Sequence, residues 1–105
     1  MPYISNAERK WYEMALQDLA HQLLAYSEGH SGHLNYVITS IVNDWLAPHP
    51  VSYERLNAAI GALECAKQEL YRRVVGPYED YKLMGGSGDV YDSGLLSNSE
   101  KAAAT

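Results

Sequence analysis

The sequence has one cysteine, no phenylalanine and no long apolar run. The cysteine count and the lack of an apolar run limit the classes of protein to which the chain can belong. The single cysteine, Cys65, excludes an internal disulfide and suits a reducing compartment. No apolar stretch reaches the length of about 18 residues that a membrane-spanning helix requires. The N-terminus also lacks the basic region and apolar core of a signal peptide. These features together predict a cytoplasmic protein with no membrane contact.

Basic residues are also few. The chain has 8 Lys and Arg against 13 acidic residues, which gives a net charge of −5. Proteins that bind duplex nucleic acid neutralise its phosphates with a run of basic side chains. This chain has no such run, so a duplex nucleic acid is not expected as a partner. A small phosphorylated ligand held by two or three cations remains compatible with the charge.

The length of 105 residues allows one domain, and a chain of this size buries a modest fraction of its surface. Residues 78–105 are poor in large apolar side chains, so the core is expected to come from residues 1–77. Association with further copies is a common way for small chains to gain burial. We therefore expect a homo-oligomer.

Tyrosine is unusually frequent, with nine Tyr and two Trp in the absence of Phe. A tyrosine ring is apolar, but its hydroxyl needs water or a hydrogen-bond partner. Such residues suit half-buried positions, interfaces and the rims of ligand sites. They are equally compatible with a small core in which Tyr takes the place of Phe.

Apolar residues recur every three or four positions in the first stretch, which predicts an amphipathic helix over residues 6–27. Ser5 and Glu8 have the spacing of a capping box, in which each side chain satisfies a backbone amide at the helix start. Gly29 follows the last apolar position and is expected to end the helix. The apolar positions of this stretch are Tyr12, Leu16, Leu19, Leu23 and Tyr26.

Two further helices are expected over residues 33–46 and 52–75. The Pro-His-Pro of residues 48–50 cannot continue a helix and separates the two. Ser52 is the expected N-cap of the third helix. Lys67 occupies a position of its apolar seam, where it either extends to the solvent edge or directs its charge inward. The apolar seam residues around it are Leu56, Ile60, Leu63, Leu70 and Val74.

Gly76-Pro77 is expected to end the third helix, because glycine and proline both disfavour its continuation. No helical period is evident after it, so residues 78–105 are expected to form an extended, partly flexible arm rich in Tyr, Gly and acids. The predicted fold is therefore all-α. It is a small three-helix antiparallel bundle over residues 1–77 with this C-terminal arm.

Cations and tyrosines gather where the third helix is expected to end. Glu69 lies three and four residues before two arginines, so ion pairing within the helix accounts for them without a ligand. The same arginines could instead hold a phosphate or carboxylate, with tyrosines stacking on a base. We expect the arm to fold back and create a polar recess beside them. The candidate ligand-binding residues are Arg72, Arg73, Lys67, Tyr71, Tyr78, Tyr81 and Lys82.

Catalytic and metal-binding patterns are weak. His30 and His33 are the only close histidine pair, with no Cys pair or His-Glu-x-x-His helix, so no metal or other cofactor is expected. The glycine-rich residues 85–89 lack the Lys-Ser/Thr of a phosphate-binding loop and are expected to form a hinge or turn. No Ser-His-Asp or Cys-His arrangement can be argued, so no enzyme is expected.

The chain resembles a family of small uncharacterised proteins found in phages and bacteria. The resemblance implies a phage or bacterial setting, with the host cytoplasm as location if the chain is phage-encoded, and it implies no mechanism. The family shows Asn-Gly-Asp-Val near its end, whereas Ser87 precedes Gly88 here. The matching segments are Met1–Ile4, Leu34–Thr39 (LNYVIT), Gly61–Lys82 (GALECAKQELYRRVVGPYEDYK) and Gly88–Tyr91 (GDVY).

Two functions compete on these grounds. The first is a non-enzymatic binding protein that sequesters a small anionic, nucleotide-like ligand through the Arg/Tyr site. The alternative is a structural or assembly protein whose C-terminal arm docks on neighbouring subunits or on a phage particle, with its tyrosines as anchors.

Overall fold

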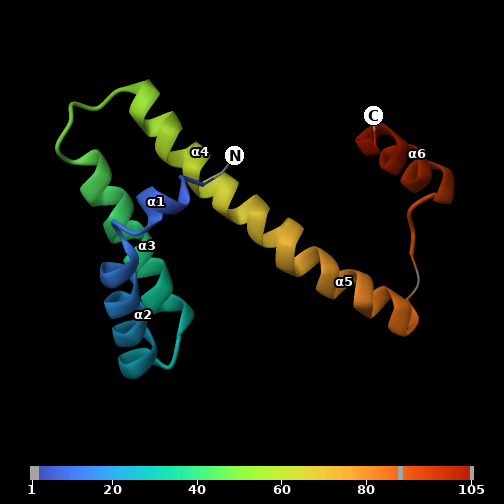
Figure 1. Ribbon diagram of the computed structural model, residues 1–105, viewed down its shortest axis with the longest axis horizontal. Coiled ribbons are helices and arrows are strands. Elements are labelled where there is room, and N and C mark those ends of the chain that lie inside the picture. The colour runs from blue at the N-terminus through green and yellow to red at the C-terminus, as the bar shows by residue number, and fades with distance from the viewer. Residues whose placement is uncertain (1–2, 88, 105) are drawn as a thin grey trace. The chain divides into compact units, whose positions relative to one another are not determined.

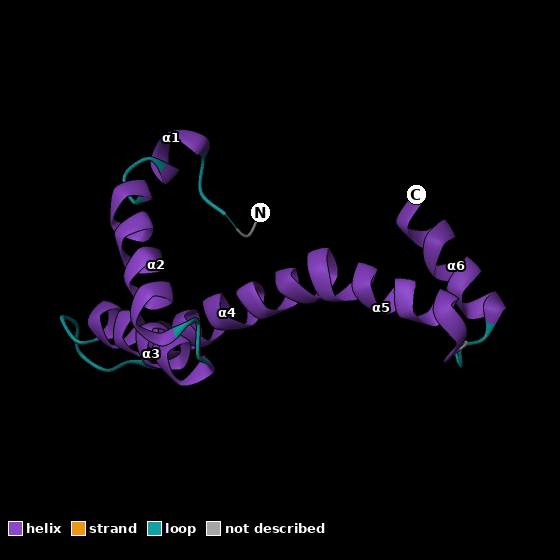
Figure 2. Ribbon diagram, turned by 90° about the horizontal axis from the view of Figure 1, so that it is seen from below, coloured by secondary structure: helices purple, strands orange, loops and turns teal. Residues whose placement is uncertain are grey.

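The computed structural model describes residues 3–87 and 89–104, and every regular element in these residues is helical (Figures 1 and 2). The prediction of an all-α protein is thereby confirmed. The turn expected around Gly88 and the matching residues Met1 and Pro2 lie outside the described residues. Over the described residues, no helix combines the length and the apolar character needed to cross a membrane. The elements are α1 (Asn6–Arg9), α2 (Glu13–Ser27), α3 (Ser31–Leu46), α4 (Tyr53–Leu70), η1 (Tyr71–Val75), α5 (Gly76–Lys82), η2 (Leu83–Ser87) and α6 (Ser93–Ala104), where η marks a π-helical turn.

The chain forms two compact units, Met1–Ala66 and Lys67–Thr105. In the first unit, the predicted capping box is present, because the Ser5 hydroxyl accepts from the amide of Glu8 and the Glu8 carboxylate accepts from Ser5. The helix expected over residues 6–27 is nevertheless divided into α1 and α2. Arg9 turns back toward the start of the chain, where Nε donates to the Ile4 carbonyl at 3.2 Å and Nη1 to Asn6 Oδ1 at 3.0 Å. A tight turn then separates the two helices.

A short turn joins α2 to α3, and these two helices contact each other as a hairpin (Figure 1). The turn requires left-handed backbone at Glu28 (φ 52°) and Gly29 (φ 76°), which confirms the expected helix end at this glycine. His30 then caps α3, because its Nδ1 accepts from the amide of Gly32 at 3.0 Å. This cap lets α3 begin at Ser31, two residues before the predicted start.

The connection between α3 and α4 is fixed by Arg55. Its guanidinium lies 4.0 Å from the centre of the Trp45 ring, and its Nη2 donates to the Trp45 carbonyl at 2.8 Å. The backbone amide of Arg55 donates to the Ser52 hydroxyl at 3.2 Å, which confirms Ser52 as the N-cap. One side chain therefore holds the last turn of α3 against the first turn of α4.

The first unit lacks an apolar interior. Among the described residues, Ala59 is the only side chain that is buried, with 7% of its surface exposed. The apolar stripes predicted from the sequence are present on the helices. Leu19, Leu23, Val37 and Val42 are half-buried, but many other large members of the stripes are exposed. Large side chains more than half exposed in this unit include Trp11, Leu16, Leu24, Ile41 and Ile60.

In the second unit, the prediction that Gly76-Pro77 ends the helix is wrong. The amide of Gly76 donates to the Tyr71 carbonyl, five residues back, so the chain makes one π-helical turn and continues as α5. Pro77 thereby falls at the start of α5, where its missing N–H is not needed. A Cβ on residue 76 would lie 3.0 Å from the Tyr71 carbonyl oxygen, so the turn favours glycine.

The extended arm expected over residues 78–105 is also corrected. The chain is helical from Gly76 to Ser87 and again in α6. The carboxylate of Asp92 accepts from the amide of Leu95 at 3.1 Å and caps α6. The alanines near the C-terminus, which looked like low-complexity tail, have the highest helix propensity of all residues and extend this helix.

Candidate functional site

The seven predicted ligand-binding residues all lie in the second unit, along one helical run. Because Gly76-Pro77 continues this run, the arm does not fold back there, and the recess expected beside the arginines is not formed by such a fold. The positions are Lys67 at the end of α4, Tyr71, Arg72 and Arg73 in η1, and Tyr78, Tyr81 and Lys82 in α5.

Arg72 is bound by an acid of its own chain. Its Nη2 donates to Glu69 Oε2 at 2.9 Å and Oε1 at 3.2 Å, and its Nε donates to Oε1 at 3.2 Å. The Arg72 side chain is 64% exposed, whereas that of Glu69 is 18% exposed. A forked arginine–carboxylate contact between neighbours on one helix is the structural pairing that the sequence allowed.

The ion pair changes the acidity of Glu69. The hydrogen bonds from Arg72 hold the pKa of the Glu69 carboxyl below its ordinary value of 4.5, and the charges of Arg72 and Arg73 lower it further. Since the folded-state pKa is lowered, the pair stabilises the helix fully above that ordinary value. The stabilisation is lost as the pH falls through the lowered pKa.

Replacing Arg72 by glutamine is expected to raise the pKa of Glu69 toward 4.5, because the hydrogen bonds that favour the carboxylate are removed. Titration of the Glu69 side-chain carboxyl by NMR measures this change. The matched variant, Arg73→Gln, removes only a more distant charge and should raise the pKa by less. If the pKa of Glu69 is the same in the Arg72→Gln variant as in the original chain, the ion pair is absent in solution.

Arg73 differs from its neighbour. Within the described part of the chain it makes no hydrogen bond or ion pair, although its charge acts on Glu69. Adjacent residues on a helix point about a quarter of a turn or more apart. The side chains of Arg72 and Arg73 therefore leave the helical run in different directions, and that of Arg72 is bound to Glu69.

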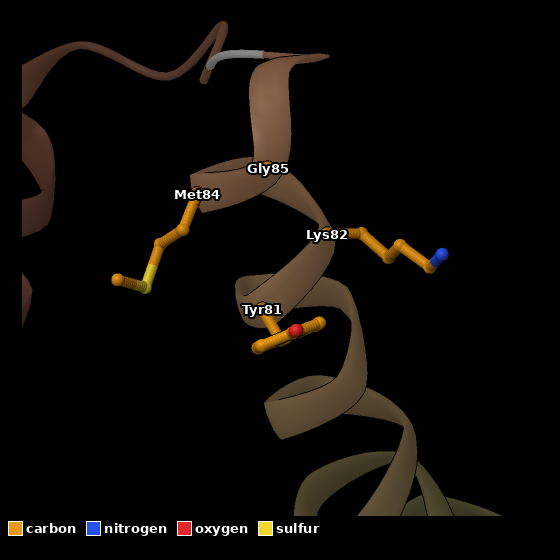
Figure 3. A pocket seen from close by; sticks show the side chains of 4 residues that line it. All are labelled: Tyr81, Lys82, Met84 and Gly85. Carbon is orange, nitrogen blue, oxygen red and sulfur yellow. The ribbon is translucent and has the colours of Figure 1, made fainter.

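Two of the predicted residues, Tyr81 and Lys82, line a hollow at the end of α5. The ammonium of Lys82 lies 5.6 Å from the centre of the Tyr78 ring, a cation–π contact one turn apart. The hollow is lined by Tyr81, Lys82, Met84 and Gly85. Figure 3 shows the side chains of Lys82 and Met84 extending to opposite sides of the helix, so they do not converge on a bound molecule.

The histidines and the cysteine are not gathered into a metal site within the described residues. The ring of His30 meets that of His33 edge-on, with centroids 6.1 Å apart, and its Nδ1 is used by the helix cap. Cys65 is exposed on α4. No three His, Cys, Asp or Glu side chains among residues 3–87 and 89–104 come close enough together to hold a metal ion.

Two features were missed by sequence reasoning. The first is the contact of Arg55 with Trp45, since no local spacing rule links residues ten positions apart across a proline-containing loop. The second is the extent of uncovered apolar surface. The short chain and its many tyrosines were the features of the sequence that indicated such uncovered apolar surface.

Comparison with known proteins places the chain in one family. The family described as "Domain of unknown function (DUF6899)" matches residues 1–90, which is most of the chain. Searches of the curated proteins and of the solved structures found no match. The match agrees with the resemblance to an uncharacterised family noted above, and it covers the Arg/Tyr segment and the first five α-helices. The chain therefore belongs to the DUF6899 family.

Proposed function

We propose that this protein is a non-enzymatic assembly protein that works as a homo-oligomer. The observation that supports the proposal is the uncovered apolar surface of its helices. Ile41 on α3 is 59% exposed and Ile60 on α4 is 65% exposed, although both occupy the apolar stripe of their helix. A second copy of the chain is the partner that is always present to cover such a stripe.

Burial of apolar side chains is the dominant favourable contribution to the free energy of folding. Moving a large aliphatic side chain from water into a packed interior gains about 1.5–3 kcal/mol. A folded chain of this size depends on many such burials to offset the entropy lost on folding. With one buried side chain among the described residues, a single copy gains little of this free energy. Association with further copies supplies the missing burial.

In this proposal, the α2–α3 hairpin completes a small antiparallel bundle with helices of another copy. The C-terminal segment is a further docking element, because Tyr91, just before α6, and Leu95, within α6, are more than half exposed. If the chain is phage-encoded, assembly takes place in the host cytoplasm.

The mass of the full chain in solution tests this function. Light scattering coupled to gel filtration should give a multiple of the 11.7 kDa chain mass at micromolar concentration. A chain ending at Ser87 removes α6 and shows whether this helix contributes to assembly. A mass of one chain across the accessible concentrations, with the helices still folded by circular dichroism, would exclude the proposal.

Binding of a small anionic ligand is a second candidate function, favoured by two residues of η1: Arg73, which makes no hydrogen bond or ion pair within the described part of the chain, and Tyr71, whose side chain is exposed. A phosphate would meet Arg73 from solvent, and a base could stack on the tyrosine. Calorimetric titration with cyclic and linear nucleotides measures it. Arg73→Gln should abolish any binding, whereas the matched change Lys10→Gln, on an exposed turn, should leave it intact. Absence of heat across the panel would remove this candidate.

A further inference from the structure

The apolar seam of α4 has the spacing of a coiled coil. Its members follow one another at intervals of four and three residues, which keeps them on one stripe of the helix. All but the last lie on α4, and the last lies in η1. The six seam residues are Leu56, Ile60, Leu63, Lys67, Leu70 and Val74.

The residue types along this seam are those of a helix that pairs with another helix. In heptad terms, the d positions are all leucine, and the a positions are Ile60, Lys67 and Val74. Leucine at d with β-branched residues at a favours two-stranded pairing, and a single polar residue at a fixes how the strands align. Leu56, Ile60, Leu63 and Leu70 are all exposed in the single chain.

We propose that α4 pairs with α4 of a second copy in an antiparallel, two-stranded contact. This inference rests on the proposed function as a homo-oligomer. A two-fold axis crosses the pair at the level of residue 65, and Lys67 of each chain lies beside Glu64 of the other. The same ion pair therefore forms twice in one dimer.

Charge decides the direction of the pairing. Parallel strands would place Lys67 directly against Lys67 of the second copy, which brings two like charges together at the seam. Antiparallel strands place Lys67 beside Leu63 and Glu64 of the second copy instead.

The seam spans fewer than three heptads, and self-sufficient coiled coils usually need about three or four. The α4 contact is thus stable as one part of an assembly that also covers the apolar faces of α2 and α3. Lys67 contributes specificity to this assembly, because it favours one alignment over the others.

Charge reversal tests the contact in the full chain. Lys67→Glu should weaken dimerisation by about tenfold or more, because it places two carboxylates together. Glu64→Lys should do the same, and the double variant Lys67→Glu/Glu64→Lys should restore the affinity to within about threefold. Lys10→Glu makes the same charge change on an exposed turn and should have no effect. Sedimentation equilibrium measures each dissociation constant.

Spin labels test the direction of the strands. In the background Cys65→Ser, a label at Glu54→Cys lies far from the two-fold axis. Antiparallel pairing separates the two labels by about 33 Å along the helix axis, whereas parallel pairing keeps them within about 20 Å. Residue 65 is level with the axis, so labels on the native Cys65 have no separation along the helix in either arrangement and serve as the control. Electron–electron double resonance measures both distances.

The outcomes separate this inference from the function on which it rests. An oligomer whose affinity ignores Lys67→Glu, or whose residue-54 labels lie close together, overturns the antiparallel α4 contact and leaves the assembly function standing. A monomer in the unmodified chain overturns both. The inference is supported if each single variant dimerises more weakly, the double variant recovers the affinity, and the residue-54 labels lie far apart.

Discussion

Replacing Ile41 by glutamine is expected to destabilise the assembled protein by about 1.5–3 kcal/mol per chain, the free energy of burying a large aliphatic side chain. In a single chain Ile41 is 59% exposed on α3, and substitution of exposed residues usually changes stability by less than about 0.5 kcal/mol. The two values differ enough for urea unfolding to distinguish them. A large loss therefore indicates that another copy covers Ile41.

Val51→Gln is the matched control for Ile41→Gln. Val51 is also aliphatic and is 88% exposed, but it lies in the connection before α4, away from the helical stripes. It should leave both the unfolding free energy and the oligomer mass unchanged. If Ile41→Gln is equally neutral, the α3 stripe faces water in the native protein and the assembly proposal loses its main support.

Replacing Arg55 by methionine is expected to lower the free energy of unfolding by about 2–5 kcal/mol. The change removes a hydrogen bond from a charged donor, worth about 1.5–3 kcal/mol, and a cation–π contact worth about 0.5–2 kcal/mol. Both interactions are made with Trp45, and they hold α3 to α4. Methionine keeps the apolar length of the side chain, so the loss reports on the guanidinium.

Arg55→Lys and Glu54→Gln complete this experiment. Lysine retains the charge but not the planar fork that both covers the Trp45 ring and reaches the carbonyl, so an intermediate loss is expected. Glu54 is exposed on the same turn and its substitution should be neutral. Circular dichroism of the helices follows the unfolding in urea. An Arg55→Met protein as stable as the original would show that the contact does not tie the helices together.

Local signals in the sequence identified much of the helical structure. The caps at Ser5 and Ser52 and the glycine turn at Gly29 each depend on neighbouring residues, so spacing alone was sufficient to find them. The failure at Gly76-Pro77 has a local cause as well. Propensity rules treat proline as a helix breaker, but one added residue in a π-helical turn moves it to a position where a helix tolerates it.

The ion pair of the candidate site could be predicted from the sequence, but the three-dimensional arrangement around it could not. Glu69 and Arg72 are three residues apart on a helix, so their ion pair followed from spacing. The recess did not form, because it depended on the chain reversing after Pro77. Interactions between distant parts of the chain, such as that of Arg55 with Trp45, depend on loop geometry that a single sequence does not specify.

The most direct test of the central claim, that burial between copies stabilises this fold, is the urea midpoint of the full chain at two concentrations. For a dimer, raising the concentration a hundredfold adds about 2.8 kcal/mol to the apparent stability. With a urea dependence of about 1–3 kcal/mol/M, the midpoint should rise by about 1–3 M between 1 and 100 µM, roughly the accessible range. The same midpoint at both concentrations would contradict the claim, because it would show that each chain folds on its own.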